Sequence, residues 1–181
     1  MACKSYSLVG INTTCDPNAG GIREVFAIPK SDITVLEGDS DTGQITTLTL
    51  AADKAFKTYK FRRGSSSFTS TLQTDPTVGN YSWLSEAALQ FNRYDTAKRL
   101  ELMALTLEET VVIVHDQNDI YYLMGYDNGV LASAGEVNSG AASTDFSGIT
   151  VTLSDESREA PFIVPDSIIS NLDIDPAPVQ S

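Results

Sequence analysis

The sequence is poor in the residues that catalytic, metal and redox sites use. Its 181 residues include two cysteines and a single histidine. Cys3 and Cys15 have neither a histidine nor a further cysteine near them, so the pair fits a zinc site poorly. No stretch approaches the ~20 apolar residues of a membrane span, and the first residues lack the apolar core of a secretory signal. We therefore expect folding in a reducing cytosol, where both thiols stay free unless the protein is released into an oxidising medium.

The motifs that carry common chemistries are also missing. The chain contains no G-x-S-x-G elbow, no Walker A loop and no G-x-G-x-x-G turn. His115 ends an apolar run, where a histidine is expected to be structural, and Asp116 would point to the opposite face of a strand. Residues 37–41 resemble a calcium loop but lack its closing glutamate. Glu156 and Glu159 are interpreted as the solvated end of a strand. The prediction is a protein that is not an enzyme and has no cofactor, metal or catalytic residues.

Positive charge is scarce as well. The chain has twelve Lys and Arg residues and 24 Asp and Glu residues, which gives a formal net charge of −12. This balance argues against a protein that grips nucleic acid, because cations are needed to displace the counterions of phosphates. It fits a protein that stays soluble before assembly, or one to which DNA passing nearby must not stick.

The few cations are clustered. Five of the twelve lie within ten residues, and they are Lys54, Lys57, Lys60, Arg62 and Arg63. One interpretation is a basic patch that meets an acidic patch on another subunit, where charge complementarity sets register and orientation. The alternative is a solvated edge strand guarded by lysines.

What is present indicates one globular domain. Hydrophobic residues make up 41% of the chain and charged residues 20%, a balance typical of a packed core. Residues 1–21 are polar and turn-rich and are expected to be an arm. Residues 22–172 form the β-rich domain, and residues 173–181, with two prolines, form an extended tail.

The predicted fold class is mainly β with one α-helix, a sandwich or barrel that contains a long β-hairpin. Its main signal is a period of two over residues 68–72 and 81–91, separated by a turn at residues 75–79. Tyr81 and Trp83 lie on the apolar parity and are expected in the core, while Glu86 lies on the polar parity. The other predicted strands are residues 22–28, 33–37, 44–51, 56–61, 110–115, 120–126, 130–137 and 149–153.

One amphipathic helix is predicted after this hairpin. Asp95 is the expected N-cap residue. Leu100, Met103, Ala104 and Leu107 are spaced as an apolar stripe, which we expect to pack on a sheet.

The order of these elements resembles that of the tail tube proteins of tailed bacteriophages, and specifically small virion proteins of phages with Bacteroidetes-type hosts. The resemblance covers most of the chain and rests on pattern. The segments that carry it are Met1–Lys4, Asn18–Ile22, Thr96–Leu100, Val111–Val114, Tyr122–Gly129, Asp145–Leu153 and Glu159–Phe162.

The resemblance implies a mechanism of assembly. In that family six subunits close into a ring, their long hairpins join into one β-barrel, and rings stack into a tube through which DNA is ejected. It implies assembly in the host cytoplasm, location in the virion tail, partners such as sheath, terminator or baseplate proteins, and no specific binding of the DNA. Glu86 becomes a candidate lumen residue. Candidate inter-subunit residues are Lys57, Lys60, Arg62, Arg63, Asp39 and Asp41.

Two other readings stay open at this point. A neck or tail-terminator ring, or a capsid decoration protein, has the same order of elements. A β-sandwich that binds carbohydrate would need exposed aromatic side chains near one edge, and Tyr121, Tyr122 and Tyr126 form the one further aromatic cluster of the sequence.

Overall fold

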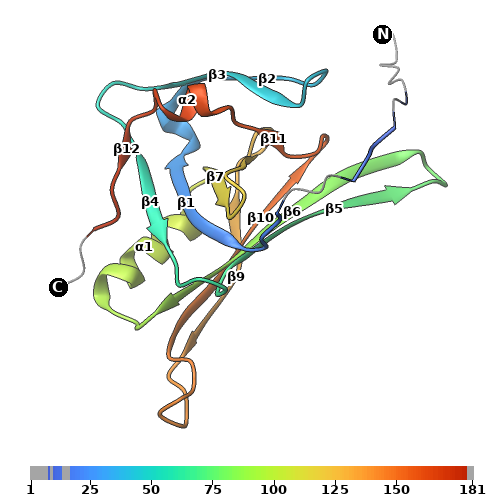
Figure 1. Cartoon of the computed structure of the whole chain (residues 1–181). Coiled ribbons are helices and arrows are strands. Elements are labelled where there is room, and N and C mark those ends of the chain that lie inside the picture. Colours follow the sequence, from blue (N-terminus) through green and yellow to red (C-terminus); the bar gives the residue numbers. More distant parts are fainter. Residues whose placement is uncertain (1–7, 9, 14–16, 179–181) are drawn as a thin grey trace.

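The computed structural model describes residues 8, 10–13 and 17–178 (Figure 1). Cys3 and Cys15, and with them the question of their pairing, lie outside these residues. The described residues form two β-sheets, with twelve strands in all, two α-helices and a 3-10 turn. None of their helices has the length and apolar character needed to cross a membrane. The predicted β-rich class with a long hairpin is confirmed.

The larger sheet has eight strands and curls on itself. Its strand order is β12–β4–β1–β7–β8–β11–β3–β2. The strands are β1 (Ile22–Pro29), β2 (Ile33–Asp39), β3 (Gln44–Leu50), β4 (Phe56–Lys60), β7 (Thr110–Asp116), β8 (Tyr121–Met124), β11 (Phe162–Ile163) and β12 (Ile174–Asp175), with the 3-10 turn η1 (Lys30–Asp32) between β1 and β2.

The smaller sheet has four antiparallel strands in the order β5–β6–β10–β9. They are β5 (Ser67–Asp75), β6 (Asn80–Asn92), β9 (Leu131–Asn138) and β10 (Gly148–Ser157). The predicted long hairpin is β5–β6, paired from Ser67↔Ala88 to Asp75↔Asn80. The alternation of the sequence therefore identified the hairpin, and the structure gives its register.

The core has two compartments, one on each side of β1 and β7. Val112 and Val114 of β7 face the smaller sheet and pack with residues of β6 and β10. Val111 and Ile113 face the other way and pack beneath the curled part of the larger sheet. A strand covered on both faces needs a continuous apolar run, which is what the sequence has here.

The α-helix α1 (Thr96–Leu107) begins as predicted, because the Asp95 side chain accepts a hydrogen bond from the Lys98 backbone N–H at 2.9 Å. The face that packs was predicted wrongly. Leu105 is buried and Leu102 packs against the core, whereas Leu100, Met103 and Leu107 are 60%, 47% and 75% exposed. The helix carries apolar residues on two opposite sides, and periodicity alone does not say which side meets the core.

Two segments near the ends of the chain, around Ala19 and at β12, are held against the domain. Asn118, in the turn after β7, exchanges two hydrogen bonds with the backbone of Ala19, at 2.8 and 3.0 Å. Near the other end, the short helix α2 (Asp166–Ile169) leads into β12, which pairs in parallel with β4. The tail therefore adds the outermost strand of the larger sheet.

Candidate assembly surface

The β5–β6 hairpin extends past the core. Strand β10 ends opposite Trp83, so the last residues of the hairpin have no partner on that side, and Figure 1 shows the hairpin projecting from the body of the domain. Leu72, Val78 and Tyr81 are 48%, 63% and 63% exposed. Tyr81 was therefore predicted wrongly as a core residue, and Trp83 is half-buried. The strand does alternate, but at this end it extends beyond the core that would cover its apolar side chains.

The face of the smaller sheet that points away from the core is called here the bare face. Glu86 lies on it, exposed, between Thr69 of β5 and Ser154 of β10. The β10 residues on this face are Thr150, Thr152, Ser154 and Glu156, because their neighbours in sequence point into the core. The bare face thus carries mostly polar side chains and carboxylates, with a few apolar exceptions such as Leu84 and Ala134.

The charge of the bare face has one sign. The four strands of this sheet contain no Lys, Arg or His. Besides Glu86, it carries Glu156 and Glu136, which is paired with Thr150. Sequence reasoning missed Glu136 because β9 consists largely of small residues and shows no readable alternation; its face became clear only from the pairing with β10.

Both edge strands of the smaller sheet lack an outer partner among the described residues. Strand β5 pairs only with β6, and β9 only with β10. Because the three pairings are antiparallel, β5 and β9 run in opposite directions. Placing β5 of one copy beside β9 of another therefore continues the antiparallel order without a break. Unpaired edges of this kind are templates for pairing with another chain.

The two edges are staggered. Strand β10 serves as the common reference. The middle of β5, at Thr71, is in register with Glu156 of β10, through Leu84 of β6. The middle of β9 is in register with Thr152 of β10. The offset of four residues corresponds to a shift of about 14 Å along the strand direction. The four strand spacings from one copy to the next measure about 19 Å perpendicular to the strands, and the ratio of these two lengths sets the tilt. Copies joined with these midpoints side by side would tilt their strands by about 35°, within the range of closed β-barrels.

The predicted basic patch is partly neutralised within the chain. Lys57 forms an ion pair with Asp175, and Lys60 lies 3.7 Å from Glu24. Strand β4 lies between β12 and β1, so the alternative of a guarded edge strand is wrong. The reason is the tail, which returns to cover β4.

The remaining predicted contact residues lie in two separate loops. Arg62 and Arg63 are exposed in the loop after β4 and form no ion pair with any residue that the structure describes. Asp39 and Asp41 lie at the β2–β3 turn, where Asp39 Oδ1 accepts a hydrogen bond from the Asp41 backbone N–H at 2.9 Å. Figure 1 shows this turn far from the β4–β5 loop, so the structure does not bring the two groups together within one chain.

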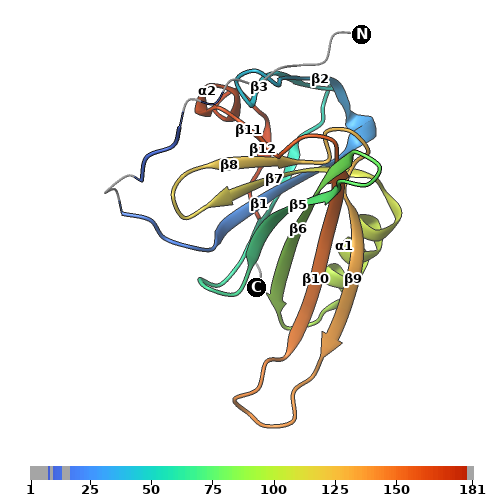
Figure 2. The same cartoon turned by 90° about the vertical axis from the view of Figure 1, so that its right-hand side faces the viewer.

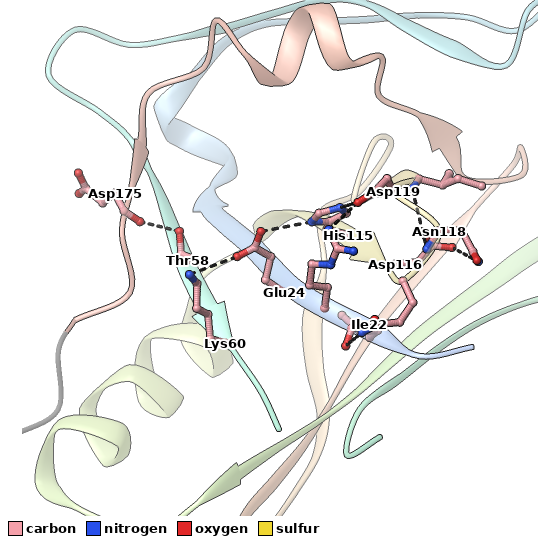
Figure 3. Close-up of polar contacts among 12 residues, drawn as sticks. Ile22, Glu24, Thr58, Lys60, His115, Asp116, Asn118, Asp119 and Asp175 are labelled. Atoms are coloured by element: carbon pink, nitrogen blue, oxygen red, sulfur yellow. Dashed lines mark hydrogen bonds and ion pairs between the residues drawn. The ribbon is translucent and has the colours of Figure 1, made fainter. Parts of the chain in front are cut away.

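His115 lies inside a polar network rather than in an open site. Its Nδ1 is 3.2 Å from Glu24 Oε1 and its Nε2 is 3.0 Å from Asp119 Oδ1 (Figure 3). His115 is buried, with 4% of the residue exposed, and its ring stacks on Tyr121. The hydrogen bond to His115 and the charge of Arg23 lower the pKa of Asp119. Both ring nitrogens lie within hydrogen-bonding distance of carboxylates, so the network ties β1 to the β7–β8 turn.

The tyrosines of the carbohydrate-binding alternative are used for packing. Tyr121 stacks on His115, Tyr122 on Phe68, and Tyr126 packs on Phe162. They do not present one common platform. A groove of about 670 Å³ lies between β4, the end of β6 and α1. Among residues 17–178, no group of three or more His, Cys, Asp and Glu could hold a metal ion.

Comparisons of the chain with protein-family models, with curated proteins and with solved structures found no match.

Proposed function

We propose that the chain is the subunit of a bacteriophage tail tube, in which the smaller sheets of six copies join into one β-barrel around a channel for DNA. The observation that carries the proposal is the four-stranded sheet with one bare face, no cation in its strands, and two staggered edges that have no outer partner among the described residues. A single domain gains nothing from leaving such edges open, because they promote aggregation; closing them into a barrel removes them.

The bare face then lines the channel. Glu86, Glu136 and Glu156 repeat around it once per copy, so the wall carries several rings of carboxylates and no cation. Such a wall repels a DNA duplex and gives its phosphates no site at which to pause. In this arrangement the protein conducts DNA without reading or holding it.

Electron microscopy of the purified protein in negative stain tests the assembly directly. At high concentration and moderate salt we expect stacked rings or tubes. Single rings that never stack would instead support a neck or tail-terminator role. A protein that stays monomeric even with other tail components present would contradict the proposal.

A cysteine cross-link tests the seam between copies. In a Cys3→Ser, Cys15→Ser background, Thr71→Cys on β5 and Ala134→Cys on β9 place a thiol on the bare face of each edge. Directly opposed residues have Cβ atoms about 4.5–5.5 Å apart, close enough for a disulfide. Mild oxidation should give a ladder of covalent oligomers that ends at the ring size. Placing the β5 cysteine two residues earlier or later, with Thr69→Cys or Gln73→Cys in place of Thr71→Cys, tests a pairing shifted by two residues.

The single-cysteine variants are the matched controls, because each can form dimers at most. Dimers alone in every register, from protein that is shown to be folded, would rule out pairing of β5 with β9.

A further inference from the structure

Two apolar surfaces of the described chain have no partner within it. The first is the outer side of α1, formed by Leu100, Met103 and Leu107 and called here the helix stripe. The second is the core-side face of the projecting hairpin, where Leu72 is paired with Trp83 and Tyr81 follows on the same face. Neither surface by itself shows what covers it. The geometry of the smaller sheet suggests that the two surfaces cover each other between adjacent copies.

Helix α1, which carries the helix stripe, runs along the edge strand β9. Helix α1 begins shortly after Asn92, which is joined through Gly148 to Asn138 at one end of β9. It ends shortly before Thr110, which exchanges two backbone hydrogen bonds with Val130 at the other end of β9. Figure 2 shows α1 alongside β9. The helix packs on the core side of the sheet, through Leu102 and Leu105.

The hairpin of a neighbour would arrive at the same place. If β5 of one copy pairs with β9 of the next, both bare faces point to the channel and both core-side faces point outward. With the midpoints aligned, Leu72 lies near the Leu131 end of β9, where α1 ends with Met103 and Leu107. The neighbour's Leu72, Trp83 and Tyr81 then face the helix stripe. Aromatic and aliphatic anchors of this kind are what stabilise an interface once water is excluded.

We propose that the helix stripe of one copy is the docking site for the β5–β6 hairpin of the adjacent copy in the same ring. This inference rests on the proposed tube function and adds to it the side-chain contact that locks the seam. It also accounts for the length of the hairpin, since the part that extends past its own core is covered by the neighbour's helix.

Trp83 provides the first test, because it is the only tryptophan of the chain. Its fluorescence should shift to shorter wavelength as the protein assembles, since the ring leaves water. Met103→Glu and Leu107→Glu should raise the concentration needed for half-assembly by at least about tenfold each, the effect of losing one buried interface anchor. Both side chains are exposed in the single chain, so these variants should fold normally, which circular dichroism verifies.

Val35→Glu is the matched control, because Val35 is also an exposed apolar residue, 38% exposed, but lies on β2 in the larger sheet. It should leave ring formation unchanged. Equal weakening by all three substitutions, or none by Met103→Glu and Leu107→Glu, would overturn the docking site.

A mixed cross-link provides the second test. In the background without native thiols, copies carrying only Tyr81→Cys are mixed with copies carrying only Met103→Cys and oxidised. A disulfide between the two kinds of copy is expected. If the β5–β9 ladder forms and this disulfide does not, in this pair or in Leu72→Cys with Leu107→Cys, the docking inference fails while the tube proposal stands. If the ladder itself does not form, both fail.

Discussion

Strands β7 and β6 are both interior strands of their sheets, yet their surroundings differ. Six of the seven residues of β7 are buried, because a core compartment covers each of its faces. In the middle of β6, buried residues alternate with exposed ones, and the residues at both ends of the strand are exposed or half-buried. Both sheets end in edge strands without an outer partner among the described residues, β12 and β2 in the larger and β5 and β9 in the smaller. They differ in their faces, because the larger sheet encloses a core compartment within one chain, whereas the smaller sheet has one covered face and one bare face. The larger sheet contains the doubly covered strands of the core, and in our proposal the smaller sheet is completed by other copies of the chain.

The largest effect on folding should come from the doubly covered strand. Ile113→Ala removes a side chain with no exposed area, and we expect a loss of about 2–5 kcal/mol in the free energy of unfolding. Thr69→Ala, on the bare face of β5, should cost less than about 0.5 kcal/mol. Urea unfolding of the unassembled protein measures both. Similar losses at the two positions would show that the sheets do not differ as described.

The next largest loss of stability is expected from substitution at the junction between the two sheets, at Gly125. Gly125 has a φ of +88°, and a Cβ there would lie 2.7 Å from the Thr110 carbonyl oxygen. Gly125→Ala should cost about 1–3 kcal/mol, the range for a strained backbone position. Gly43→Ala, at φ +68° with nothing within 4 Å of the added Cβ, is the control that isolates the steric clash from the backbone preference. A thermal unfolding series that shows equal losses would contradict a packed junction.

Asp155 connects the same junction to the smaller sheet and should make its stability depend on pH. Its Oδ2 accepts a hydrogen bond from the Gly125 N–H at 2.8 Å, and its Oδ1 is buried without a hydrogen-bond partner among the described residues. Burial raises the pKa of Asp155. The folded state therefore favours the protonated acid, and stability falls as pH rises from the ordinary aspartate pKa through the raised one.

Asp155→Asn removes this titration and keeps an oxygen for Gly125. At neutral pH we expect the variant to be more stable by about 1 kcal/mol, because burying an amide costs less than burying a charge. The advantage should shrink as pH falls through that window. Denaturation midpoints at several pH values measure it, and a difference that does not change with pH would refute the assignment.

The smallest effect on folding, under about 0.5 kcal/mol, is expected for Glu86→Lys on the bare face. Its consequence should appear only in the assembly, where assembled rings of the variant retain duplex DNA at low salt and release it as salt is raised. Glu108→Lys, at the exposed end of α1, changes the charge equally on a surface away from the proposed channel. DNA retention by both variants, measured by sedimentation with labelled duplex, would show that the bare face does not line the channel.

Much of the fold could be predicted, because its signals are local. The period of two identified β5–β6, and Asp95 identified the start of α1. The errors arose where the outcome depends on distant parts of the chain. Strand β4 is not an edge because β12 returns to it from the tail, and Tyr81 is exposed because β10 ends before reaching it.

By itself the sequence determined the composition of each strand: the continuous apolar run of β7, the alternation of β6, and four strands without a single cation. Only the tertiary structure decided that those four strands form one sheet, that Glu86, Glu136 and Glu156 share its bare face, and that its edges are open and staggered. The physical reason is that side-chain alternation is a property of one strand, whereas coverage of a face or an edge depends on which other strands reach it.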